Sequence, residues 1–124
     1  MMNLRECYET IGGDYDEVLG RLCSERLVQK FVLKFLDDKS YEQLWDSMES
    51  GDRETAFRAA HTIKGICQNL AFTRLYESDH QLTEALRAGE MEQASVLIEK
   101  VKEDYEHTVA AIRAFQDFSP SISG

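Results

Sequence analysis

The chain has 124 residues, of which 43% are hydrophobic and 30% are charged. This length and balance fit one globular domain, and they exclude a disordered chain and a pair of ordinary domains. The formal net charge of −9 argues against nucleic acid or an anionic membrane as the main partner, because both bind through clustered lysine and arginine. The sequence shows no apolar run long enough to span a membrane and no signal peptide, so a cytoplasmic protein is expected.

Helical periodicity along the whole chain predicts an all-α domain. The expected helices cover residues 4–10, 14–22, 25–37, 41–50, 53–71, 73–88 and 91–115. No strand-like alternation interrupts them, and the single proline, Pro120, lies beyond the last helix. The predicted N-caps are Asp14, Ser24, Ser40 and Asp52, with Gln43 completing a capping box at Ser40.

The connections between these helices are short, and short connections favour antiparallel neighbours. The expected architecture is therefore an antiparallel up-and-down four-helix bundle, with the shorter N-terminal helices laid across it. We expect a monomeric helical domain over residues 1–118 and a flexible tail over residues 119–124. The three cysteines, Cys7, Cys23 and Cys67, are widely spaced and are expected to be reduced, structural residues rather than disulfide or zinc ligands.

The helix expected over residues 53–71 has two opposite faces. His61, Lys64, Gly65 and Gln68 fall within about 60° of one another on a helical wheel. A glycine inside an exposed helix costs roughly 1 kcal/mol relative to alanine, which suggests that something must approach closely at Gly65. The apolar residues lie about 140° to 260° from His61 and are Ala56, Ala59, Ala60, Ile63, Ile66, Cys67 and Leu70.

This polar face has the groups needed to hold a phosphoryl group. A neutral imidazole at His61 is a competent nucleophile toward phosphorus, and a cation one turn away at Lys64 can stabilise the transferring charge. The missing side chain at Gly65 would leave an open path for a partner, and Gln68 could hydrogen-bond the ring or a phosphoryl oxygen. The neighbouring pair Phe57 and Arg58 are candidate docking contacts, although Phe57 could instead fold over the edge of the bundle.

The stretch His61-Thr62-Ile63-Lys64-Gly65, followed by Asn69 and Leu70, resembles the HxxKG signature of histidine-containing phosphotransfer domains. The resemblance implies a phosphorelay carrier that is loaded at His61 by a sensor kinase system or a receiver aspartate and unloaded by a second receiver aspartate. It also implies that Lys64 stabilises the phosphate and that Gly65 gives access. One departure is Ala71, where the family often has a glycine, and it puts the backbone bend there in doubt.

The partners implied by the resemblance are receiver domains and a sensor histidine kinase. No glycine-rich phosphate loop is present, so we expect a carrier without a kinase site or cofactor of its own, with Mg²⁺ on the receiver. One alternative is a helical interaction module with a vestigial HxxKG motif. A second alternative, a metal-binding bundle using Glu77 with His80 and Asp104 with His107, is disfavoured because the wheel turns these two motifs toward solvent.

Overall fold

A computed structural model describes residues 2–117, and within them all the regular secondary structure is helical, as predicted. The predicted tail, residues 119–124, lies outside the described residues. The helices match the seven expected from the sequence to within a few residues at each end. They are α1 (Leu4–Ile11), α2 (Tyr15–Leu22), α3 (Glu25–Lys34), a short 3₁₀ turn η1 (Phe35–Asp37), α4 (Ser40–Ser50), α5 (Arg53–Leu70), α6 (Thr73–Ala88) and α7 (Met91–Asp117).

Three of the four predicted N-caps are confirmed. The side chains of Asp14, Ser24 and Asp52 each accept a hydrogen bond from the backbone N–H three residues later, which satisfies one of the free donors at the start of a helix. At α5 the Asp52 carboxylate also accepts the Thr55 hydroxyl at 2.7 Å, and this bond lowers the pKa of Asp52. The start of the site-bearing helix is therefore well fixed.

The prediction for Ser40 is wrong. Ser40 is the first residue of α4 rather than its cap, and the capping position belongs to Lys39, whose side chain makes no capping bond. The Asp38 carboxylate instead accepts the Ser40 N–H at 3.0 Å. The Gln43 N–H, which a capping Ser40 hydroxyl would accept, donates to the Lys39 carbonyl at 3.1 Å, so the helix begins one residue earlier and the predicted capping box does not form.

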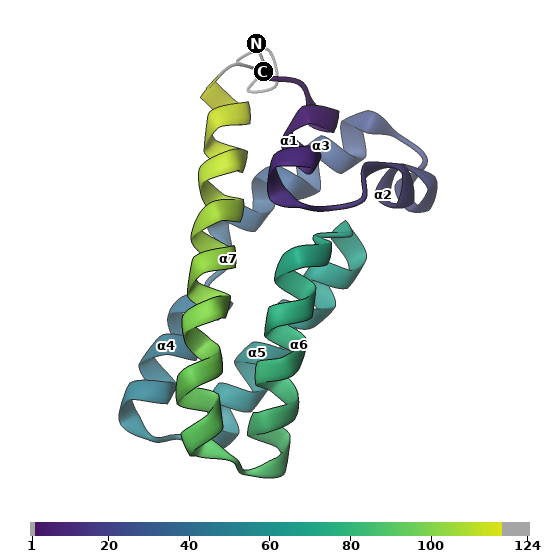
Figure 1. Ribbon diagram of the computed structural model, residues 1–124. Helices are drawn as coiled ribbons and strands as arrows, with labels where there is room; N and C mark the ends of the chain where they lie inside the picture. Colours follow the sequence, from purple (N-terminus) through teal and green to yellow (C-terminus); the bar gives the residue numbers. More distant parts are fainter. Residues whose placement is uncertain (1, 118–124) are drawn as a thin grey trace.

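Helices α4 to α7 pack in chain order, each against the next, and α7 runs the length of the molecule (Figure 1). Tyr41 of α4 stacks on Tyr105 of α7 with ring centroids 3.7 Å apart, so the first and last of these four helices also meet. Helices α1 and α3 pack against the C-terminal half of α7, and α2 packs against α1 and α3, at the end of the molecule where α5 finishes (Figure 1). This arrangement agrees with a four-helix bundle that carries short N-terminal helices.

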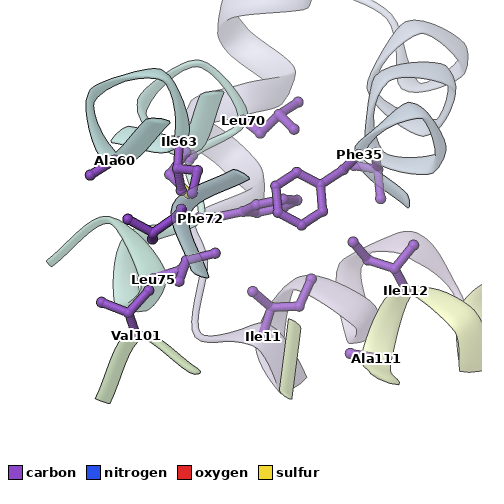
Figure 2. Packing of buried hydrophobic residues seen from close by; sticks show 14 of the residues in the cluster. Ile11, Phe35, Ala60, Ile63, Leu70, Phe72, Leu75, Val101, Ala111 and Ile112 are labelled. Carbon is purple, nitrogen blue, oxygen red and sulfur yellow. The ribbon is translucent and has the colours of Figure 1, made fainter. Parts of the chain in front are cut away.

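The hydrophobic core is continuous between the bundle and the N-terminal helices. Phe72, in the turn between α5 and α6, is fully buried, and its ring lies 5.3 Å from Phe35 and 5.6 Å from Tyr8. Figure 2 shows Phe35 and Phe72 meeting between Leu70 and the N-terminal elements. Burying one such side chain stabilises the fold by about 1.5–3 kcal/mol, so this aromatic cluster joins the two parts firmly.

Hydrogen bonds from α1 and α2 close the C-terminal end of α5, where a helix leaves its last carbonyl groups without helical partners. The Tyr8 hydroxyl donates to the Leu70 carbonyl at 2.7 Å. Arg21 Nη1 donates to the carbonyls of Gln68 and Asn69 at 2.8 and 2.6 Å. The short N-terminal helices therefore hold the end of the helix that carries the polar face.

The bend after α5 is present despite the alanine at its centre. Ala71 adopts the left-handed conformation with φ 57°, and the Phe72 N–H donates to the Cys67 carbonyl at 2.9 Å. Asp14 donates its backbone N–H to the Ala71 carbonyl at 2.9 Å, and a Cβ on Gly13 would lie only 2.6 Å from that oxygen. The doubt about this bend is resolved, because tertiary bonds hold Ala71 in a conformation that glycine adopts more easily.

The cysteines are unpaired in the described part of the chain, and they differ in environment. Cys7 and Cys67 are buried, in keeping with the structural role expected of them. Cys23 is exposed and ends α2 in the left-handed conformation with φ 59°, which makes it a strained surface residue. Within residues 2–117, no helix has the length and apolar character needed to cross a membrane.

Candidate functional site

The amphipathic character of α5 decides which of its side chains reach the surface. Six of the seven residues predicted for its apolar face are buried, and Ile66 is half-buried at the edge. His61 is exposed on the opposite side. The fixed ends of α5 therefore hold the imidazole at a defined place on the surface, which a flexible loop could not do.

Phe57 lies next to His61 and departs from its predicted exposure. It is half-buried against the core, with its ring centroid 5.8 Å from the His61 ring and 4.9 Å below the Arg87 guanidinium of α6. The arginine covers the aromatic face through a cation–π contact, so less of the ring is free than expected. Arg58, the other predicted docking residue, is exposed.

Lys64 and Gly65 follow one turn after His61. Lys64 is half-buried. A Cβ built on Gly65 would meet nothing within 4 Å, and the residue sits inside a regular helix, so neither packing nor backbone conformation requires glycine there. Gln68 is exposed at the far end of the face, and its backbone carbonyl is the one held by Arg21. The structure thus places the four predicted residues on one accessible side of α5.

One charged residue near this site was not predicted. Asp79 of α6 is completely buried in the interface with α5, and its Oδ1 atom has no hydrogen-bond partner in the described chain. Burial raises the pKa of this carboxyl to about 8, and the Thr83 hydroxyl and the Lys64 ammonium lower it only in part. A sequence signal existed: Asp79 lies four residues after Leu75 and three before Leu82, on the apolar stripe of its helix.

The residues of the metal-site alternative are scattered. No group of three or more histidine, cysteine, aspartate or glutamate side chains placed to hold a metal occurs within residues 2–117. Glu77 and His107 are exposed, as the helical wheel predicted. His80, however, is half-buried and stacked on the Tyr76 ring, and Asp104 is buried beside Lys100, so these two side chains do not point to solvent.

An apolar groove adjoins the C-terminal half of α5. It has a volume of about 550 Å³ and opens between α2, α3, η1 and α5. Phe31 of α3 is 38% exposed at its wall, and Ile66, the residue after Gly65, also lines it. The residues of α5 that line the groove, Ile66, Asn69 and Leu70, all follow Gly65.

The comparison with known families decides the classification of the chain. Residues 25–114 match the family described as the Hpt domain. The chain belongs to this family. Hpt domains act in histidine phosphotransfer within two-component signalling, as phosphocarriers rather than as enzymes.

The match begins at α3 and ends near the end of α7, so α1 and α2 lie outside the matched residues. No curated protein and no solved structure matches the chain. The two helices that hold the end of α5 through Tyr8 and Arg21 thus lie before the matched residues.

Proposed function

We propose that this Hpt domain carries a phosphoryl group on His61 between receiver domains of a phosphorelay. In the loading step a ring nitrogen of His61 attacks the phosphorus of a receiver aspartyl phosphate. The N–P bond forms as the P–O bond to the aspartate breaks, and the carboxylate leaves with the electron pair. Unloading is the reverse step onto a second receiver. The observation that carries the proposal is the exposed imidazole on a rigid helix, beside an open glycine position.

The neighbours of His61 support this chemistry. In this proposal Lys64 stabilises the charge on the transferring phosphoryl group, since its ammonium is carried one helical turn from the imidazole. Gly65 admits the receiver, because no side chain occupies the space beside it. Gln68 hydrogen-bonds the ring or a phosphoryl oxygen. Mg²⁺ and the remaining polar groups of the reaction belong to the receiver.

The partners we propose are receiver domains and, upstream, a sensor histidine kinase. The receiver would contact Phe57 and Arg58 on one side of His61 and cover the apolar groove on the other. Its contact with the groove is testable through Phe31, because this ring lines the groove and is partly exposed. Phe31→Ser should raise the receiver concentration needed for half-maximal transfer without changing the rate at saturation.

Incubation with a phosphorylated receiver domain tests the proposal directly. We expect the mass of the protein to increase by one phosphoryl group, in a form that is labile to acid and stable to base. His61→Gln should abolish the increase, and His107→Gln, which changes an exposed histidine on α7, serves as the matched control that keeps it. A wild-type chain that is not phosphorylated by any of a panel of receivers would favour the alternative, an interaction module with a vestigial motif.

Two further substitutions separate the roles of the neighbours. Lys64→Ala should slow transfer while circular dichroism and the denaturation midpoint show an intact fold. A series from Gly65→Ala to Gly65→Leu to Gly65→Trp should slow transfer progressively, because each larger side chain fills more of the approach path. Unchanged transfer with tryptophan at position 65 would contradict the access role of this glycine.

A further inference from the structure

A buried carboxyl group without a full set of partners needs an explanation, since such groups are costly in a protein interior. Asp79 is 0% exposed, its Oδ1 has no hydrogen-bond partner among the described residues, and its Oδ2 is 3.4 Å from the Thr83 hydroxyl. A leucine at this position would continue the apolar stripe at lower cost. The position of Asp79 relative to the proposed phosphorylation site suggests why a carboxyl is present.

The register of the α5–α6 hairpin places Asp79 level with Lys64. The chain reverses at Ala71 and Phe72. Phe57, fourteen residues before Ala71, contacts Arg87, fifteen residues after Phe72, so residues at nearly the same distance from the turn lie opposite each other. Lys64 is seven residues before Ala71 and Asp79 is seven residues after Phe72. The two opposite charges therefore face one interface at the same level.

The groups that act electrically on Asp79 within residues 2–117 come from α5. One is Lys64, whose ammonium lowers the pKa of Asp79. The other is the buried Cys67 thiol, whose pKa is raised mainly by burial and further by the charges of Asp79 and Asp38. The other helix packed against α6, α7, contributes no such group. Among the residues that the structure describes, Lys64 is thus the one cation that lowers the pKa of Asp79.

We propose that Asp79 is a positioning residue for phosphoryl transfer that controls how freely the Lys64 ammonium can bind the phosphoryl group on His61. As a carboxylate, Asp79 attracts the ammonium toward the helix interface, and the flexible four-carbon stem of lysine allows that movement. As a neutral acid, it leaves the ammonium free to turn toward the phosphoryl oxygens. The inference rests on the proposed function of His61 and deepens it.

The consequence is a pH dependence of transfer that resides in this chain rather than in the receiver. Because the pKa of Asp79 is about 8, the carboxyl is mostly neutral at pH 7 and about nine-tenths ionised at pH 9. The rate for wild type, divided by that for Asp79→Asn, should therefore fall between pH 7 and pH 9 by several-fold, with a limit of about tenfold if only the neutral form supports transfer. Taking the ratio at each pH removes the pH dependence of the receiver itself.

The experiment measures transfer from a phosphorylated receiver to five proteins at pH 7, 8 and 9. They are the wild type, Asp79→Asn, Lys64→Met, the double variant Lys64→Met with Asp79→Asn, and Asp104→Asn as the matched buried carboxyl on α7. The rate of each protein is divided by the rate of Asp79→Asn at the same pH. We expect this ratio to fall with pH for the wild type and for Asp104→Asn, because both keep the Asp79 carboxyl. The double variant should be slow at every pH, with the same profile as Lys64→Met alone.

A second measurement detects the contact in the unphosphorylated protein. Carboxyl NMR titration should give a higher midpoint for Asp79 in Lys64→Met than in the wild type, because the compensating cation is lost. Equal midpoints would overturn the inference, as would identical pH profiles of transfer in wild type and Asp79→Asn. A wild-type protein that is never phosphorylated would overturn the proposed function first, and this inference with it.

Discussion

The stability of the fold should decrease as the pH rises from 5.5 to 7.5, because of Asp79. The pKa of this carboxyl is about 8 in the folded protein, against about 3.9 for an aspartate in an unfolded chain. Between these values the unfolded chain releases the proton and the folded chain keeps it. The contribution of this group is therefore fully present below about pH 4, and it is lost as the pH rises toward 8.

The magnitude follows from the size of the pKa difference. One pH unit inside this window changes the free energy of unfolding by about 1.4 kcal/mol for a single group, so two units give about 2 to 3 kcal/mol. The Asp52 carboxylate does not contribute to this window. Its pKa is lowered by its hydrogen bonds to Thr55, so its stabilisation is present above about pH 4 and is lost only in more acidic solution.

Urea denaturation followed by circular dichroism, at pH 5.5, 6.5 and 7.5, measures this slope. The wild type should lose stability steadily across the range, whereas Asp79→Asn should show little slope, since its amide does not titrate. Asp104→Asn provides the matched control and should keep the wild-type slope. Equal slopes in the wild type and Asp79→Asn would refute the assignment of a raised pKa to this residue and the reasoning from its burial.

Three further substitutions test local features of the fold, each through the midpoint of urea denaturation. Gly65→Ala should stabilise the protein by about 1 kcal/mol, because the added methyl group meets no atom within 4 Å and alanine is the better helix former; a loss of stability would contradict the open space at this position. Cys23→Gly should stabilise it by about 0.5 to 1 kcal/mol by relieving the left-handed backbone of an exposed residue. Tyr8→Phe should destabilise it by about 1 to 2 kcal/mol, because the Leu70 carbonyl loses its 2.7 Å hydrogen bond in a buried place. No change in that variant would mean that water replaces the hydroxyl.

The helices and the polar face of α5 were predictable because both depend on local spacing. Caps such as Asp14, Ser24 and Asp52 act within three residues, and the phase of His61 against Ile63 and Cys67 follows from helical geometry alone. The error at Ser40 has the same local origin. The helix begins one residue earlier than predicted, with the Asp38 carboxylate accepting the Ser40 N–H, and the local pattern did not distinguish these two starting points.

The features that the sequence did not reveal depend on contacts between distant segments. Arg87 covers the Phe57 ring only because α5 and α6 form a hairpin with a particular register. The hydroxyl of Tyr8 meets Leu70 across an interval of 62 residues, which no periodic pattern records. Asp79 is an intermediate case. Its place on the apolar stripe was visible in the sequence, but its relation to Lys64 required the turn at Ala71 to be located in space.

The attachment of α1 and α2 to the end of α5 has a practical consequence for experiments on isolated pieces of this protein. A fragment that begins at residue 25, where the family match begins, would lack Tyr8 and Arg21. The carbonyl groups of Leu70 and Gln68 would then lose their hydrogen-bond donors, and the Phe72 side chain would become more exposed to solvent. The first matched residue would then be a poor guide to where a stable fragment begins. Chimeras and domain transplants should keep the first twenty-four residues with the rest. Without them, His61 would be studied on a helix whose C-terminal end is no longer held.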